Sequence, residues 1–186
     1  MKENKFLSFF VPLFDYIDSG RFFREPFRWL YAIIAVLNLL APIVLLAIAG
    51  SNGLFEYGGG KLIAAFILAW IVFVFIMWIG FQLWWNRREK VYAVSEAQDD
   101  FVAIPVYSHF IQTCGEWLGV VIGIGGTLFS LIAVLFGVAD AFRVLYLPVG
   151  GILLCPVYGF MAVVVTRVLA ETFRALASIA NNTRKH

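Results

Sequence analysis

Charged residues are scarce in this chain, and cysteine, histidine and methionine are rarer still. Only 14% of the 186 residues are charged, whereas 62% are hydrophobic and 17% are aromatic. A typical soluble domain is about 25% charged and about 45–50% apolar, so the composition excludes that class and predicts an integral membrane protein. The net charge of +2 is too small to indicate a nucleic-acid partner.

The few residues that could support chemistry form no recognisable pattern. The two cysteines, Cys114 and Cys155, are too few for a disulfide framework, and we expect both to be free thiols. His109 and His186 show no metal-ligand spacing with them, and the sequence contains no nucleophile motif. We therefore expect no catalytic residue, no metal, no other cofactor and no enzymatic activity.

Four apolar runs are each long enough to cross a hydrocarbon core of about 30 Å as a helix. They cover residues 29–49, 62–83, 117–138 and 144–165. No Asp, Glu, Lys, Arg or His lies deep within any of them. Because proton relays and coupled transporters depend on such residues, this absence argues against both classes.

The links between the runs differ in length, and they set the expected fold. The stretches 50–61 and 139–143 are short, so we expect two tight antiparallel hairpins, over 29–85 and 117–165. A long cytoplasmic loop over 86–116 would join them. The chain is thus expected to be one domain, residues 1–186, folded as an all-α, integral-membrane four-helix bundle.

Lysine and arginine are distributed unevenly across the membrane. Of the 14 such residues, all but Lys61 and Arg143 fall on the side that carries both termini and the long loop. The positive-inside rule then predicts a multi-pass protein with both termini in the cytoplasm and the lipid bilayer as its first partner.

Both ends of the chain are expected at or beyond the inner membrane surface. Residues 1–28 alternate phenylalanines with charges, as an amphipathic interfacial segment does, and would act as an anchor or as a sensor of lateral tension. Residues 166–186 should continue the last span as a cytoplasmic helix, with Leu169, Phe173 and Leu176 docked on the N-terminal segment or the long loop. On another face, charged residues at i, i+4 and i+7 predict an interfacial cluster: Arg167, Glu171 and Arg174.

A stripe of glycines marks one face of the third span. Gly115, Gly119 and Gly123 recur at i, i+4 and i+8. Within lipid, small side chains let two helix backbones approach closely. The stripe therefore predicts either packing against a helix of the same chain or a subunit contact in a homo-oligomer.

The strongly polar side chain in mid-membrane is Asn38. Pro42, four residues further on, lacks the N–H group that would bond the Asn38 carbonyl, and it should kink the helix. The two residues could line a polar path. Alternatively, the Asn38 side chain could hydrogen-bond across a helix interface.

The two ends of the chain also resemble a known family. The stretch "RVLAETFRALASIANNTR" is similar to the closing signature of a small bacterial membrane family, domain of unknown function 4282, and the resemblance rests on Arg167, Glu171, Asn182, Thr183 and Arg184. The stretch "LFDYIDSGRFFREPFRWLY" resembles the aromatic lead-in to that family's first span. The resemblance implies a location in a bacterial inner membrane, and it brings no known activity.

These observations favour a non-enzymatic inner-membrane protein that acts by assembly. It would work either as a homo-oligomer or as a small subunit of a larger membrane complex. The alternative is an oligomeric pore or tension-gated channel, in which Asn38 or small residues line the conduit.

Overall fold

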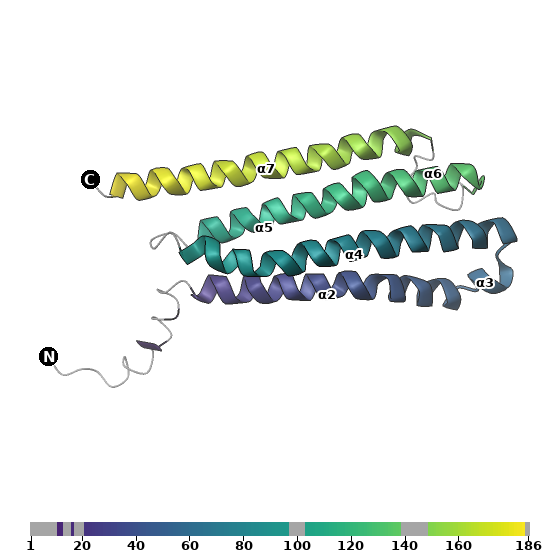
Figure 1. Ribbon diagram of the computed structural model, residues 1–186, viewed down its shortest axis with the longest axis horizontal. Coiled ribbons are helices and arrows are strands. Elements are labelled where there is room, and N and C mark those ends of the chain that lie inside the picture. The colour runs from purple at the N-terminus through teal and green to yellow at the C-terminus, as the bar shows by residue number, and fades with distance from the viewer. Residues whose placement is uncertain (1–10, 13–15, 17–20, 97–102, 139–148, 185–186) are drawn as a thin grey trace.

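The chain folds into four long helices that lie side by side (Figure 1). The computed structural model describes residues 11–12, 16, 21–96, 103–138 and 149–184. Their elements are α2 (Arg21–Ser51), α3 (Leu54–Tyr57), α4 (Gly60–Glu96), α5 (Ala103–Leu118), η1 (Gly119–Gly126), α6 (Thr127–Leu135) and α7 (Gly150–Arg184). All four long helices, counting α5, η1 and α6 as one, are apolar and long enough to cross a membrane. The expected all-α membrane bundle is confirmed.

Neighbours in the sequence are neighbours in space. The most extensive contacts are those of α2 with α4 and of α7 with α5 and η1, while α4 and α5 join the two pairs. Consequently α2 and α7 lie at opposite edges of the bundle (Figure 1). The first expected hairpin is present as α2, α3 and α4, whereas the connection at 139–148 lies outside the described residues.

Glycines with positive φ end two of the helices. Gly53, at φ 70°, turns the chain after α2 into the short α3, and a side chain there would run into the ring of Tyr57. Gly137, at φ 64°, follows α6. There the Gly137 N–H donates to the Val134 carbonyl, and the Val138 N–H donates to the Ala133 carbonyl, which together form a Schellman cap.

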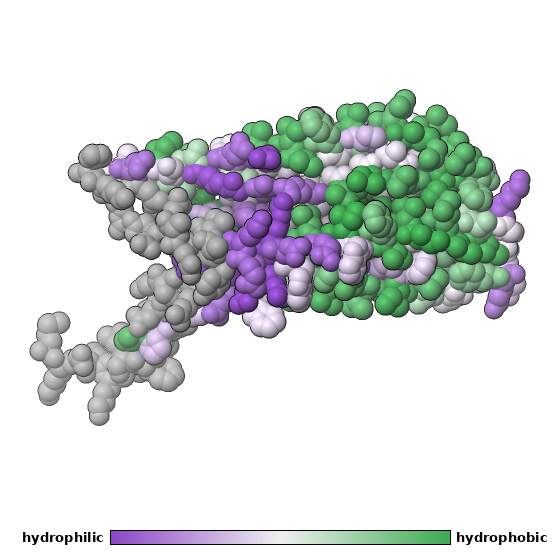
Figure 2. All heavy atoms as spheres, in the orientation of Figure 1, coloured by the Kyte–Doolittle hydropathy of each residue, from purple (hydrophilic) through white to green (hydrophobic). Residues whose placement is uncertain are grey.

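The helices are longer than a membrane requires. The 37 residues of α4 span about 55 Å at 1.5 Å per residue, against a hydrocarbon core of about 30 Å. Apolar side chains cover the part of the molecule that ends at α3 and α6, and polar side chains gather towards the other end (Figure 2). We call these regions the apolar band and the charged end, the latter defined by Arg28, Arg87, Arg88, Arg167 and Arg174.

The expected loop over 86–116 is wrong, because most of it is helix. Residue 86 to Glu96 continues α4, and Ala103 to residue 116 forms most of α5. The charges of "NRREK" end the apolar run, but Arg, Glu and Lys are good helix formers, so the helix itself continues. Pro105 fits because it lies in the first turn of α5, where its missing N–H would have no helical partner. The third helix therefore begins 14 residues before 117.

The boundaries of the first and last helices also differ from expectation. Residues 21–28, assigned to the interfacial segment, are the first turns of α2, and Pro26 lies inside that helix without ending it. Most of the remaining N-terminal segment, 1–20, lies outside the described residues. The last helix begins at Gly150, six residues after the expected start of the span at 144.

The helical extension after the last span is confirmed, and its expected docking face is correct for Phe173 but wrong for Leu169 and Leu176. α7 continues to Arg184. Ala170 and Ala177 are buried, and Phe173 contacts Tyr107 of α5 edge-to-face at 5.9 Å. Leu169 and Leu176 are instead 45% and 54% exposed. The small alanines allow close helix packing, so the extension docks through them on part of the supposed loop.

Candidate polar site at the charged end

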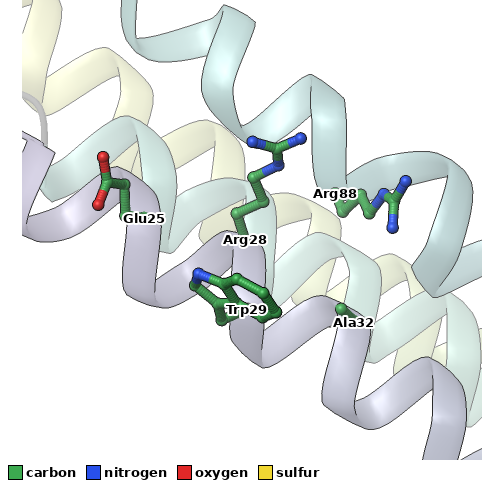
Figure 3. A pocket seen from close by; sticks show the side chains of 5 residues that line it. All are labelled: Glu25, Arg28, Trp29, Ala32 and Arg88. Atoms are coloured by element: carbon green, nitrogen blue, oxygen red, sulfur yellow. The ribbon is translucent and has the colours of Figure 1, made fainter.

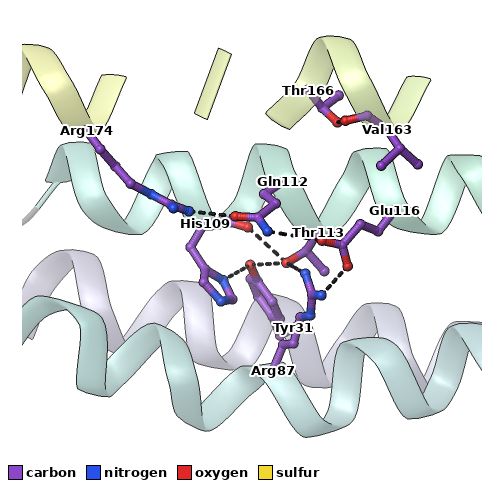
Figure 4. Close-up of polar contacts among 9 residues, drawn as sticks. All are labelled: Tyr31, Arg87, His109, Gln112, Thr113, Glu116, Val163, Thr166 and Arg174. Carbon is purple, nitrogen blue, oxygen red and sulfur yellow. Dashed lines mark hydrogen bonds and ion pairs between the residues drawn. The ribbon is translucent and has the colours of Figure 1, made fainter. Parts of the chain in front are cut away.

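A network of polar side chains lies between all four long helices at the charged end (Figure 4). Of the eight members that carry its main bonds, one comes from α2, one from α4, five from α5 and one from α7. The members that carry its main bonds are Tyr31, Arg87, Ser108, His109, Gln112, Thr113, Glu116 and Arg174.

The centre of the network is the hydroxyl group of Tyr31. Its oxygen lies 2.9 Å from Nδ1 of His109 and 3.2 Å from Oγ1 of Thr113, and Thr113 in turn donates to the His109 carbonyl at 2.9 Å. All three bonds are satisfied together when His109 carries its proton on Nδ1, donates to Tyr31, and Tyr31 donates to Thr113. Tyr31 and Thr113 are fully buried and His109 is 8% exposed, so the hydroxyl connects α2 to α5 away from solvent.

Aromatic packing encloses this centre. The Tyr31 ring meets Trp84 of α4 edge-to-face at 4.9 Å and Phe110 of α5 at 6.0 Å. Ala35 and Val91 complete a buried cluster around them. Because these neighbours are apolar, an unmade hydrogen bond at the centre would be costly, and the side chains are held in one arrangement.

A charged arm extends from the centre towards α7. Arg87 donates to Thr113 at 3.3 Å and pairs with the carboxylate of Glu116. Gln112 donates to the second Glu116 oxygen at 3.1 Å and accepts from Arg174 of α7 at 2.6 Å. The Arg87 and Glu116 side chains are only 21% and 25% exposed, and their mutual pairing offsets the loss of hydration.

Asn38 forms a second bridge, one to two turns deeper in the apolar band. Its Nδ2 donates to the Ile34 carbonyl at 2.8 Å, and its Oδ1 accepts from the Trp117 indole at 2.9 Å. The bond crosses Gly80 of α4, where any side chain would collide with Asn38 and Trp117. The expectation that Asn38 hydrogen-bonds across a helix interface is confirmed.

At Asn38 and Pro42, the polar groups that could line the proposed path are already hydrogen-bonded within the chain. Asn38 is 4% exposed, and its amide is used by the bonds just described. The Pro42 carbonyl accepts a hydrogen bond from the Trp70 indole of α4 at 2.9 Å. Both residues thus serve contacts between helices of one chain.

The glycine stripe faces α7 of the same chain. A Cβ atom at Gly115 would collide with Thr166, and one at Gly119 would lie 2.5 Å from Val163. Gly123 faces the Cα atom of Gly159. The stripe therefore serves packing within the chain, the first of its two expected roles. Gly119 and Gly123 belong to the π-helical segment η1, which lies along α7.

The expected charge cluster on α7 is divided between two surroundings. Arg167 pairs with Glu171 at 3.3 Å, and both side chains are more than 60% exposed. Arg174 turns away from them into the network, where it also donates to Ser108 at 2.9 Å. Exposed ion pairs contribute little to stability, so of these three residues Arg174 has the larger structural role.

Sequence reasoning missed the network because it treated α5 as a loop. The signal that could have found it is a helical spacing in that segment: His109, Thr113 and Glu116 stand at i, i+4 and i+7. From the sequence, Arg87 contributes only to the count of basic residues that predicts the orientation in the membrane. In the described part of the chain, no three or more His, Cys, Asp or Glu side chains gather as metal ligands.

Comparisons of the chain with protein-family models, with curated proteins and with solved structures gave no match. The resemblance to domain of unknown function 4282 accordingly stays a prediction.

Proposed function

We propose that this is a non-enzymatic membrane protein that acts by assembling with further copies of itself through α7. The glycine stripe packs against α7 of the same chain, while Gly119 and Gly123 also line an open groove between η1 and α7. The support for α7 is an apolar seam that continues past the apolar band and that the described residues leave uncovered.

The seam follows a heptad pattern. Its positions alternate in steps of four and three residues and are all exposed: Val165, Leu169, Thr172, Leu176, Ile179 and Thr183. Leu169, Leu176 and Ile179 are 45%, 54% and 61% exposed. The two threonines present their methyl groups, because their hydroxyls donate to the carbonyls of Val168 and Ile179.

The C-terminal part of the seam lies beyond the hydrocarbon core, where lipid would not cover it. Starting at Gly150, about 20 residues of α7 cross a hydrocarbon core, so the core ends near Leu169. Lipid would cover apolar side chains before that point, whereas Leu176 and Ile179 would face water. An uncovered apolar stripe in water favours a protein partner.

A second copy of the chain fits this seam. Two copies inserted in the same direction present their α7 helices in parallel, and a parallel pair of identical heptad seams is self-complementary. Arg167 and Glu171 lie on another face of α7, so they do not interrupt the seam. We infer a contact that continues from the lipid-facing part of α7 into the aqueous extension.

The proposal includes a bacterial inner membrane and cytoplasmic termini. The support is the charged end, which gathers five arginines of α2, α4 and α7, while Lys61 lies at the start of α4 at the opposite end. The positive-inside rule assigns such an end to the cytoplasm.

The test is the native mass of the protein extracted gently with its lipids. We expect a symmetric multiple of the 20.9 kDa chain. In a variant with Leu176→Ala and Ile179→Ala, the dissociation constant of the oligomer should rise about tenfold or more, because each copy would bury two shorter side chains in the contact. The control, with Leu153→Ala and Val157→Ala, shortens exposed side chains of α7 within the lipid and should leave the mass unchanged.

A monomeric wild-type protein would contradict self-assembly. If the mass contained other polypeptides, α7 would instead be the contact of a small subunit with a larger complex. The pore hypothesis is tested separately by ion flux in liposomes: a conducting oligomer must leak, and the variant with Leu176→Ala and Ile179→Ala must lose the leak together with the assembly.

A further inference from the structure

A second polar feature of the charged end lies on the outer surface of α2 and α4, apart from the buried network. It is a pocket of about 280 Å³ lined by Glu25, Arg28, Trp29, Ala32 and Arg88 (Figure 3). Four of these residues come from α2, and Arg88 comes from α4. The pocket is therefore built where the two helices meet.

The two guanidinium groups at the pocket share one carboxylate. Arg28 donates to Glu89 at 2.9 Å, and Nε of Arg88 lies 3.2 Å from the same Glu89 oxygen. In this pairing the Glu89 carboxylate faces two positive charges, while Glu25, the second carboxylate at the pocket, accepts a hydrogen bond from the Tyr16 hydroxyl at 3.1 Å. Among the described residues, Arg28 uses only Nη2 in this pairing, which leaves further N–H groups of its guanidinium for an anion.

The cations are held in position rather than loose. The Arg88 guanidinium stacks over the Trp85 ring, with Cζ 3.6 Å from the ring centroid. Arg28 is tied to α4 through Glu89. Two guanidinium groups that contact the same carboxylate can also donate paired hydrogen bonds to a phosphate.

The depth of the pocket points to the source of that phosphate. Trp29 is 69% exposed and begins the apolar run of α2, and exposed tryptophan indoles are enriched at the headgroup level of a bilayer. Ala32, about one turn further along α2 and within the same apolar run, also lines the pocket. A phospholipid entering here would place its acyl chains along the apolar band and its phosphate beside the arginines.

We infer that this pocket binds the phosphate group of a phospholipid headgroup, held between Arg28 and Arg88 and flanked by Trp29. Glu25, at the same pocket, would accept a hydrogen bond from a hydroxyl or ammonium group next to that phosphate. The site does not depend on self-assembly, because α2 and α7 lie at opposite edges of the bundle.

The experiment measures phospholipid retained by the detergent-solubilised chain, using native mass spectrometry and titration with short-chain phosphatidylglycerol. We expect a variant with Arg28→Gln and Arg88→Gln to weaken binding about tenfold or more, because two charge-assisted contacts are lost. The matched control is Arg167→Gln, which removes an exposed arginine of α7 that lines no such pocket and should bind as the wild type does.

Two further measurements separate loss of the lipid site from loss of folding and from binding of free phosphate. The Arg28–Glu89 pair is about half exposed and contributes little to folding, so the double variant should keep its melting temperature. If the double variant melts at a lower temperature, Arg88→Lys replaces it in the test. This change keeps the charge but not the planar fork, and it should lose part of the lipid affinity. Equal binding by the double variant and the wild type would overturn the site. Inorganic phosphate that displaced the lipid at matching concentration would overturn the lipid as its source.

Discussion

The backbones of α7 and η1 approach each other closely at Gly159. Gly159 of α7 packs against η1, and a Cβ atom there would lie 2.5 Å from the Cα atom and 2.7 Å from the nitrogen of Gly123. Both are backbone atoms, so no side chain can rotate away. We predict that Gly159→Ala forces the two helices apart.

The expected cost follows from these distances. An ordinary carbon contact is about 3.5–4.0 Å, so the helices must separate by about 1 Å where Gly159 packs against η1. Overpacking of this kind costs about 1–3 kcal/mol, and the gain in helix propensity from Gly to Ala returns no more than about 1 kcal/mol. We expect a net loss of about 1–2 kcal/mol in the free energy of unfolding.

The facing residue provides the control. A Cβ atom at Gly123 would lie 3.5 Å from Gly159 and 3.9 Å from the Cys155 carbonyl oxygen, both ordinary contacts. Gly123→Ala should therefore be neutral or slightly stabilising. Unfolding in mixed micelles with increasing sodium dodecyl sulfate measures both variants, and equal stabilities for Gly159→Ala and Gly123→Ala would refute the packing described for α7 and η1.

Three further predictions concern the polar bridges. Tyr31→Phe should lower the free energy of unfolding by about 1–3 kcal/mol in the same assay, because it leaves buried partners unsatisfied; a neutral result would mean that the hydroxyl is not buried as described. A double-mutant cycle of Asn38→Leu and Trp117→Phe should give a coupling energy of about 1 kcal/mol, whereas strict additivity would exclude their bond. Glu116→Gln should destabilise the protein more than Arg87→Met combined with Glu116→Gln, since only the single variant leaves a poorly hydrated charge unpaired, and the reverse order of stabilities would disprove the pairing.

The four membrane helices could be predicted from the sequence because each depends on local composition alone. A run of about 20 apolar residues must satisfy its own backbone hydrogen bonds in lipid, and the helix is the local way to do so. The hairpin through Gly53 followed from the same kind of local evidence, a glycine-rich turn between two such runs.

The extent of the helices beyond the membrane could not be predicted in the same way. Residues 86–96 and 103–116 are polar enough to read as a loop, and what makes them helical is packing against partners far away in the sequence. Tyr31 and His109 are 78 residues apart, and no local periodicity joins them. Their contact depends on the order in which the helices stand.

The glycine stripe shows the same division between local and tertiary information. The spacing of Gly115, Gly119 and Gly123 correctly indicated a close helix contact, but it could not name the helix that fills it. The docking face of α7 was misjudged in part for a related reason. The prediction placed large apolar residues in the contact. Instead, Ala170 and Ala177 are buried there, because their small size allows α5 to approach.

The measurement that tests self-assembly most directly is a cysteine cross-linking scan of α7 in native membranes, in a chain whose Cys114 and Cys155 are replaced by alanine. Assembly through α7 predicts disulfide-linked dimers when cysteine stands at 169, 172, 176 or 179. It predicts no such dimers when cysteine replaces Glu171 or Ser178, which are exposed but lie off the seam. Cross-links without this heptad period, or none at the seam positions, would contradict assembly through α7.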